Sequence, residues 1–370
     1  MSQQQSVFRV LSIDGGGMRG YYSAAFLHEL YALAENRFGQ PDFDLSKNLQ
    51  MVVGTSTGAI VGAGLVAGLS PEEIMRFYSA YGEKIFPQRL PSKPLGFLWH
   101  RRKRINKSGD SALRNGLIEA FGETTLAEVY RKKGIALVIP TVDATTHRGW
   151  VFKTPHNHDT NHRDDAYSLV DVCMASSAAP IYRSLAAIKQ PGKSTAKDMF
   201  VDGGLWANNP VLVALSEALR LAKPNQPIEI FCLGTSPEIV GAVLDSSSPH
   251  WGLFDWRFGG KALELSLDAQ AGVFDYLANS FSSHLNRPVS ITRFPQRPPS
   301  ASQSELLGMD CSSKASLDLM RQLASGASDD TNQLISTQSP EGLRIKSLLK
   351  SSLTTHEEIT SIAANGDIHV

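Results

Sequence analysis

Residues 50–67 read QMVVGTSTGAIVGAGLVA. The run before Gly54 is short and apolar, as in a buried strand, and the run after Thr57 is apolar and long enough for a helix. Between them lies a G-x-S-x-G pattern, which is typical of a nucleophile elbow, where a strand turns sharply into a helix and holds a serine hydroxyl at the bend. The stretch therefore predicts a strand, a tight turn and a helix, with Ser56 at the turn and with Gly54 and Gly58 leaving room for the crossing.

The same order of strand, loop and helix recurs along the chain. Strands are expected at residues 7–13, 135–142, 149–154, 199–201 and 228–233, and helices at 21–38, 70–85, 168–177 and 210–221. This alternation predicts an α/β fold with a mainly parallel central sheet and helices on both faces. We assign this core to residues 7–243. Beyond it the pattern changes to a helix-like stretch, a proline-rich segment and a serine-rich end, so residues 244–370 are expected to form an accessory helical region.

A second glycine segment, DGGGMRG at residues 14–20, follows the first expected strand. The N–H groups of Gly15, Gly16 and Gly17 can turn toward one anionic point, and Arg19 adds positive charge, so the segment is a candidate oxyanion hole. The glycines also satisfy the G-x-G-x-x-G dinucleotide fingerprint, but that fingerprint expects an acidic residue after the second strand, where this chain has the serine turn. A nicotinamide- or flavin-dependent oxidoreductase is therefore the weaker alternative, and glycines that serve only a tight turn are another.

A third segment, Asp202-Gly203-Gly204, follows the strand expected at 199–201. Strand ends present side chains to the ligand crevice of an open sheet, so Asp202 can face Ser56 and act as its base. This role requires burial of the carboxyl group, because an aspartate with the ordinary pKa of about 3.9 is a weak base at neutral pH. The alternative is an aspartate that only caps a turn.

Histidine offers another base. The chain has ten histidines, any of which could complete a Ser-His-Asp triad, but none has a spacing that marks it. His156, His158 and His162 lie in a polar segment where solvent exposure is expected. The residues therefore favour a serine and aspartate pair and leave a triad esterase open.

Composition narrows the class of protein. The 370 residues are 42% hydrophobic with 36 basic and 36 acidic side chains, so a large core is expected and a general affinity for nucleic acid is not. Cys173, Cys232 and Cys311 lie far apart, which is typical of buried thiols rather than of disulfides or a metal site. Residues 1–5 lack a signal-peptide pattern, and the longest apolar stretch, 59–69, is too short to span a bilayer. A cytoplasmic protein that contacts membranes transiently is expected.

Three segments in this order resemble motifs of the patatin-like phospholipase family: 14–20, 54–58 and 202–204. The stretches ASSAAP at 175–180 and DGGLWANNP at 202–210 are similar to further family blocks, and the resemblance covers residues 7–233. It implies a three-layer α/β/α core and a dyad of Ser56 and Asp202 without histidine. It also implies an oxyanion hole at Gly15, Gly16 and Gly17, no metal or other required cofactor, and glycerolipid esters as substrates, which are cleaved to a fatty acid and a lysolipid.

Among bacterial members, the chain is similar to phospholipase effectors of cyclic-nucleotide-based antiphage defence. This similarity implies an enzyme that is activated by a cyclic di- or trinucleotide, assembles into a homo-oligomer and degrades phospholipid at the inner membrane surface. A constitutive lipase of the same family is the alternative, and a catalytically inactive lipid-binding module is a further one.

Residues 90–110 are expected to form a lid or a membrane contact. Two aromatic residues there precede four consecutive cations: Phe97 and Trp99, then Arg101, Arg102, Lys103 and Arg104. An apolar tip beside positive charge suits contact with anionic headgroups, and the same cations could bind the phosphates of a regulatory nucleotide. The alternative is a loop whose aromatic side chains pack inward and whose charges are solvated.

Overall fold

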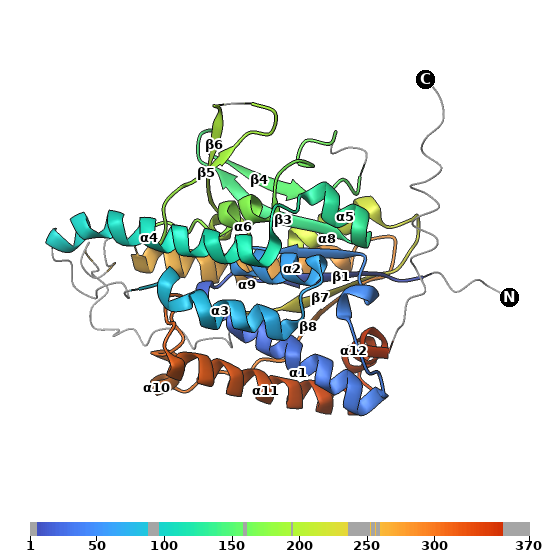
Figure 1. The fold of residues 1–370 in the computed structure, drawn as a ribbon. Coiled ribbons are helices and arrows are strands. Elements are labelled where there is room, and N and C mark those ends of the chain that lie inside the picture. The colour runs from blue at the N-terminus through green and yellow to red at the C-terminus, as the bar shows by residue number, and fades with distance from the viewer. Residues whose placement is uncertain are drawn as a thin grey trace, which may run out of the picture.

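The computed structural model of the protein describes residues 6–87, 96–157, 161–193, 195–235, 252, 256 and 260–350, with the backbone alone for 96–105, 260–261 and 263–264. Within these residues an eight-stranded sheet carries helices on both of its faces (Figure 1). The predicted α/β fold with a mainly parallel sheet is confirmed.

The strands lie in the order β5-β6-β3-β2-β1-β7-β8, and β4 also pairs with β3. From β3 through β2, β1 and β7 to β8 the neighbours run parallel, whereas β4, β5 and β6 pair antiparallel. Their bounds are β1 Phe8–Ile13, β2 Met51–Gly54, β3 Ala136–Asp143, β4 Arg148–Lys153, β5 Ala186–Lys189, β6 Lys197–Asp202, β7 Ile228–Leu233 and β8 Val289–Arg293. Strands β5 and β8 were not predicted from the sequence, because both are short and β8 lies just before the proline-rich segment.

The register of β3 explains how two distant segments meet. Val138 pairs with Val53 of β2 and with Lys153 of β4, so these two strands lie on opposite sides of β3. Thr141 pairs with Trp150 of β4 and with Asp202 of β6, so β6 lies on the same side of β3 as β2. The C-terminal ends of β2 and β6 therefore lie near each other along the same edge of β3.

Both faces of the sheet are buried. On β1, Leu11 and Ile13 face a core formed with α1, α2, α3 and α6, whereas Phe8 and Val10 face a second core formed with α8 and α9. Burial on both faces explains why the central strands read as continuous apolar runs.

The longer helices are α1 Gly20–Phe38, α2 Thr57–Ala67, α3 Pro71–Ile85, α4 Gly96–Phe121, α8 Val211–Leu221, α9 Gly260–Ser282, α11 Lys314–Ser336 and α12 Pro340–Lys350. The shorter ones are α5 Leu126–Lys133, α6 Leu169–Ser176, α7 Gly204–Ala207 and α10 Ala301–Ser304, with 3₁₀ turns η1 Gly17–Arg19 and η2 Leu45–Asn48. Of the helices in the described residues, none is long and apolar enough to cross a membrane.

Part of the segment after residue 243 is integrated with the sheet. Strand β8 pairs with β7, and α11 packs along α1 on the side away from the sheet (Figure 1). The helix-like stretch expected in this segment is α9. The boundary between a core ending at residue 243 and an accessory region stays a prediction.

A capping box sets the start of α3, as the Ser70-Pro71-Glu72-Glu73 sequence leads one to expect. Ser70 Oγ accepts a 3.2 Å hydrogen bond from the Glu73 N–H, and Glu73 Oε2 accepts a 2.8 Å bond from the Ser70 N–H.

We predict that Ser70→Ala, which removes the first of these bonds, lowers the free energy of unfolding by about 1 kcal/mol, measured by urea denaturation followed by circular dichroism. Ser111→Ala is the matched control, since within the described residues that exposed serine bonds only the Lys107 carbonyl of its own helix. An equal loss in both variants would contradict the role of the cap.

Candidate active site

The turn between β2 and α2 holds Ser56 in an unusual backbone conformation. Its φ is 56° and its ψ is −118°, a combination that side-chain-bearing residues rarely adopt. The two flanking glycines are required by close packing: a Cβ on Gly54 would collide with the Gly58 carbonyl, and one on Gly58 with the Ile13 carbonyl. The strand, tight turn and helix predicted around Ser56 are therefore present.

Ser56 and Asp202 are in direct contact. Ser56 Oγ donates a 2.7 Å hydrogen bond to Asp202 Oδ2, and the N–H of Gly204 donates a 2.7 Å bond to Asp202 Oδ1. The Ser56 N–H donates to Ser176 Oγ at 2.9 Å, and that hydroxyl donates to the Pro140 carbonyl at 2.7 Å. Both carboxylate oxygens and the serine backbone are thus held in place by separate partners.

Burial raises the pKa of Asp202 from 3.8 to about 6. The hydrogen bonds from Gly204 and Ser56 and the charge of Arg183 act in the opposite direction but do not outweigh the burial. A carboxylate with this pKa accepts a proton more readily than an ordinary aspartate and is still mostly ionised at neutral pH. Asp202 therefore has the burial that a role as base requires.

Sequence reasoning missed Arg183. Its side chain is 5% exposed, lies in the wall of the cavity beside Asp202 and forms a 2.8 Å ion pair with Asp110 of α4. A lone arginine in a loop has no pattern that distinguishes it from a solvated one, so only the fold shows that this charge is buried.

The glycine segment places two free backbone donors near the serine. Within the described residues the N–H groups of Gly16 and Gly17 have no partner, and both residues line the same cavity as Ser56. The N–H of Gly15 instead donates a 2.8 Å hydrogen bond to the Asn208 carbonyl. The prediction that Gly15 supplies an oxyanion donor is therefore corrected: its N–H already holds the loop to the segment after Asp202.

Arg19 supports the loop from behind. Its Nε lies 3.3 Å from the Gly16 carbonyl, and its side chain is not part of the cavity lining.

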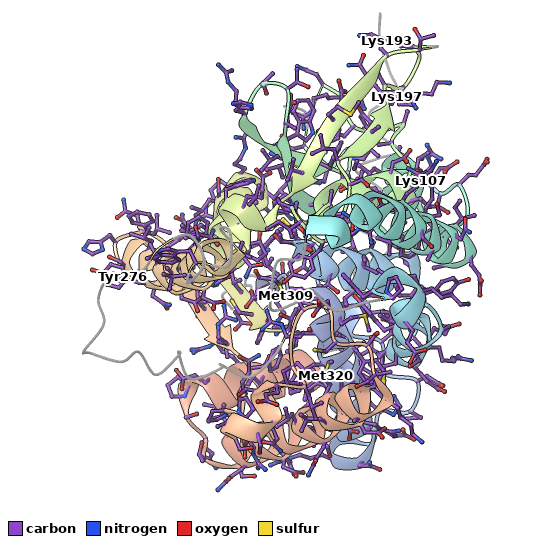
Figure 2. The ribbon with its side chains drawn as sticks, turned by 90° about the vertical axis from the view of Figure 1, so that its left-hand side faces the viewer. Lys107, Lys193, Lys197, Tyr276, Met309 and Met320 are labelled. Atoms are coloured by element: carbon purple, nitrogen blue, oxygen red, sulfur yellow. The ribbon has the colours of Figure 1, made fainter. Side chains whose placement is uncertain are left out.

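The C-terminal part of the chain contacts this loop through Met309, whose carbonyl accepts a 2.8 Å bond from the Met18 N–H. A Cβ on Gly17, where φ is 60°, would collide with the same carbonyl. Figure 2 labels Met309 where the C-terminal segment meets the N-terminal part of the molecule.

A cavity of about 70 Å³ opens at Ser56 and Asp202. Its walls are mostly apolar and come from α2, α3, α4, α9 and the loop after α6. The apolar lining residues include Ile60, Phe77, Tyr78, Ile85, Leu113, Pro180 and Leu267. Ser56, Asp202 and the glycine loop form its polar end. The arrangement can bind an apolar chain and hold a polar bond at the serine.

No histidine of the described residues lines this cavity. His162 is largely exposed, as expected, and His158 lies outside the described residues. A Ser-His-Asp triad has no candidate histidine in the part of the chain that the structure describes. In the same part, no group of three or more histidine, cysteine and acidic residues is arranged to hold a metal ion.

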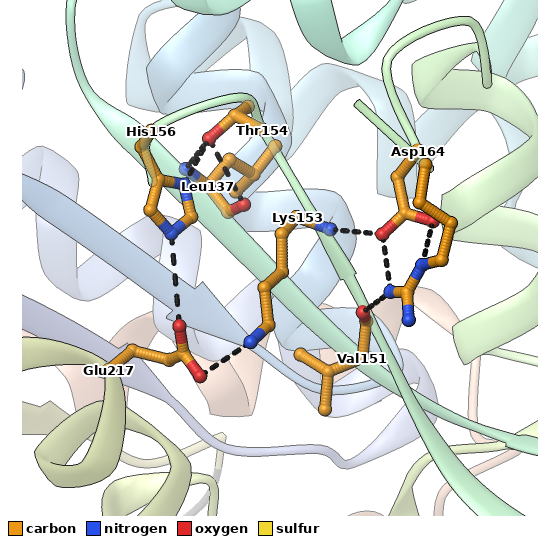
Figure 3. A network of polar contacts seen from close by, with 8 residues as sticks. Leu137, Val151, Lys153, Thr154, His156, Asp164 and Glu217 are labelled. Atoms are coloured by element: carbon orange, nitrogen blue, oxygen red, sulfur yellow. Dashed lines mark hydrogen bonds and ion pairs between the residues drawn. The ribbon is translucent and has the colours of Figure 1, made fainter. Parts of the chain in front are cut away.

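The expected exposure of His156 is wrong. Its side chain is 1% exposed. Its Nδ1 lies 2.7 Å from Thr154 Oγ1, and its Nε2 lies 3.9 Å from Glu217 of α8 (Figure 3). Lys153 donates a 2.6 Å hydrogen bond to the same carboxylate. Burial alone raises the pKa of Glu217, but the nearby His156 and Lys153 outweigh this and hold the pKa at about 2. The carboxylate on α8 could not be anticipated from the polar segment itself.

The expected lid cannot be placed in full. Residues 96–105 form the first turns of α4, whereas residues 90–95 and the side chains of Phe97, Trp99 and the cations Arg101 to Arg104 lie outside the description. The lid or membrane contact at 90–110 stays a prediction.

The raised pKa of Asp202 predicts a pH-dependent effect on stability. The folded protein binds this proton more tightly than the unfolded chain, so the contribution of Asp202 to stability falls as the pH rises from 3.8 to about 6. We expect Asp202→Asn, which removes this fall, to unfold at a higher temperature than the wild type at pH 8 and at a similar temperature near pH 4. The shift from 3.8 to about 6 corresponds to about 3 kcal/mol.

Differential scanning calorimetry at the two pH values measures this difference. Asp318→Asn, which alters an exposed aspartate of α11, is the control and should match the wild type at both. A difference between Asp202→Asn and the wild type that did not change with pH would contradict the prediction.

Comparison with known proteins identifies the family to which this chain belongs. The model of the patatin-like phospholipase family matches residues 11–215. A cGAMP-activated phospholipase from Pseudomonas aeruginosa is 33% identical over 273 residues, 73% of this chain and 74% of that protein. Another from Vibrio cholerae is 29% identical over 291 residues, 75% of this chain and 78% of that protein. VipD from Legionella pneumophila, a solved structure, aligns with all of this chain and 83% of its own at 12% identity and a TM-score of 0.34. The chain belongs to the patatin-like phospholipase family and is a lipid acyl hydrolase.

Proposed function

We propose that the protein hydrolyses acyl ester bonds of membrane phospholipids, with Ser56 as nucleophile and Asp202 as base. The observation that carries this proposal is the 2.7 Å hydrogen bond from Ser56 Oγ to Asp202 Oδ2 at the polar end of an apolar cavity. A serine hydroxyl is a weak nucleophile and needs a base in contact, which a buried carboxylate supplies. A histidine triad has less support, since no described histidine reaches the site.

The proposed reaction has two steps. Ser56 Oγ attacks the ester carbonyl carbon, its proton passes to Asp202 Oδ2, and the oxyanion forms against the N–H groups of Gly16 and Gly17. When the intermediate collapses, the bond to the glycerol oxygen breaks and Asp202 returns the proton to that oxygen, which releases the lysophospholipid. A water molecule then gives a proton to Asp202 and attacks the acyl-serine, and the fatty acid leaves as the proton returns to Ser56.

The cavity and its surroundings favour a lipid substrate at a membrane surface. Ile60, Phe77 and Leu113 offer an apolar wall for an acyl chain. Leu205 lines the cavity and is 39% exposed, and Leu185, which follows the lining residues Tyr182 and Arg183 in the loop after α6, is 57% exposed. Apolar side chains exposed beside an apolar pocket are typical of enzymes that take a substrate from a lipid surface.

We also propose that a cyclic oligonucleotide activates the enzyme. Two relatives that align with about three quarters of this chain are called cGAMP-activated phospholipases. By this similarity we extend an activator of the cyclic di- or trinucleotide class, and a role in antiphage defence at the cytoplasmic membrane surface, to this chain. The cations Arg101 to Arg104 remain candidates for contact with lipid headgroups or with the activator, and assembly on activation stays part of the proposal.

Loss of the serine tests the reaction. We predict that Ser56→Ala abolishes release of fatty acid from bacterial lipid extract, measured by mass spectrometry with and without a panel of cyclic nucleotides, and also abolishes labelling by a fluorophosphonate. Asp202→Asn should cost about as much, because members of a catalytic unit are not additive. Ser111→Ala, in which an exposed serine is lost, is the control and should match the wild type.

The outcomes separate the alternatives. Labelling that persists in Ser56→Ala would reject Ser56 as nucleophile. Wild-type turnover that no cyclic nucleotide changes would reject the activator and favour a constitutive lipase. Lipid binding without turnover would favour an inactive binding module.

The pKa of Asp202 sets the expected pH dependence. Asp202 acts as a base only when ionised, so kcat/KM should fall about tenfold for each pH unit below about 6 and level off above it. Initial rates on a soluble short-chain ester between pH 4.5 and 8 measure this profile without a membrane. A profile that is flat through pH 6 would mean that Asp202 is not the base.

A further inference from the structure

Arg293, the last residue of β8, binds carboxylates on two different elements. Its Nη1 donates a 2.7 Å hydrogen bond to Asp14 Oδ2, and its Nη2 donates a 2.9 Å bond to Asp275 Oδ1 of α9. Asp14 follows the end of β1 directly and opens the glycine loop. One planar guanidinium therefore ties the start of this loop to a helix that follows it by more than 200 residues in the chain.

Helix α9 also holds the segment after Asp202. Asn209 Nδ2 donates to Asp275 Oδ1 at 2.9 Å and to the Ala271 carbonyl at 3.1 Å. Gln270 Oε1 accepts a 3.0 Å bond from the Asn208 N–H. Asp275 Oδ1 thus receives hydrogen bonds from both Arg293 and Asn209, so this carboxylate links the two loops of the catalytic centre.

We propose that Arg293 is a positioning residue for the reaction. By joining Asp14 to Asp275 it fixes the glycine loop relative to the segment that carries Asp202, and so sets where the oxyanion donors lie relative to the base. The inference rests on the proposed function of Ser56 and Asp202. Arg293 lies outside residues 11–215, the part of the chain that the family model matches.

Charge gives Arg293 a second effect on the same step. Burial raises the pKa of Asp14 to about 6, whereas the Arg293 charge and hydrogen bond lower it. Asp14 Oδ1 and Arg293 Nε are both buried and have no hydrogen-bond partner within the described residues. The bond between Arg293 Nη1 and Asp14 Oδ2 is therefore the direct contact that balances the two charges. Arg293 thus favours the ionised form of Asp14 and balances its charge two residues from Gly16, where negative charge develops in the reaction.

The test compares two arginines four residues apart. Arg293→Met removes the link between the loops, whereas Arg297→Met, the matched control, removes an exposed ion pair with Asp330. On a soluble p-nitrophenyl ester we expect Arg293→Met to lower kcat about 10- to 100-fold with KM changed less than about twofold, because oxyanion donors act in the transition state. Arg297→Met should keep both constants within about twofold of the wild type.

A second readout does not depend on turnover. Amide hydrogen exchange in Arg293→Met should become faster in the peptides that contain Gly16 and Gly17 and in those that contain Asn208 and Asn209, with the rest of the sheet unchanged. Arg297→Met should leave both regions at wild-type rates. A residue with a merely structural role would lower the unfolding temperature without this local pattern.

The outcomes are distinct from those of the proposed function. If Ser56→Ala is inactive while folded Arg293→Met keeps wild-type kcat or wild-type exchange in both loops, the inference is overturned and the dyad stands. If Ser56→Ala stays active, the dyad is overturned, and the exchange pattern alone decides the role of Arg293. Should Arg293→Met not fold, Asp275→Ala replaces it: this variant keeps the bond from Arg293 to Asp14 but removes the acceptor on α9, and wild-type kcat and exchange in it would reject the proposal.

Discussion

The hydrogen bond between Ser56 and Asp202 is the contact on which the arrangement of this molecule depends. The two residues are 146 positions apart, and the bond forms only because β2 and β6 lie on the same side of β3, one beyond the other. Reversal of β6 relative to the parallel strands brings its C-terminal residue, Asp202, toward the end of β2.

The edge of the sheet near this bond collects the other parts of the site. The glycine loop leaves the end of β1, Thr235 after β7 donates a 2.8 Å hydrogen bond to the Gly15 carbonyl, and Arg293 ends β8. Carboxyl ends of neighbouring parallel strands lie together, so residues from distant parts of the chain converge there without long loops. This convergence also explains why the segment after residue 243 contributes to the centre through β8 and α9, although its sequence shows no motif.

The parts of this structure that could be predicted are those whose physics is local. An apolar run, two glycines and a serine between them determine the elbow, and Ser70 with Glu73 determines the start of α3. Asp202 could be paired with Ser56 because a strand end and an Asp-Gly-Gly turn are both visible in the sequence. The partners of individual groups could not be predicted, because they come from segments that only the fold brings together. Examples are the Asn208 carbonyl, which accepts from the Gly15 N–H, and the carboxylates that lie against the buried side chains of Arg183 and His156.

The centre contains several groups that oppose folding, and their location explains why they are tolerated. Ser56 has a positive φ, Asp202 is a buried carboxylate with a raised pKa, and Asp14 Oδ1 is buried without a partner in the described residues. Each lies at or just after a strand end between two large cores, so relaxation of any one would require the sheet or a packed helix to move. The surrounding burial therefore holds the serine, the base and the donors in an arrangement that the local chain would not adopt alone, and the same burial keeps water from the carboxylate and makes it a better base.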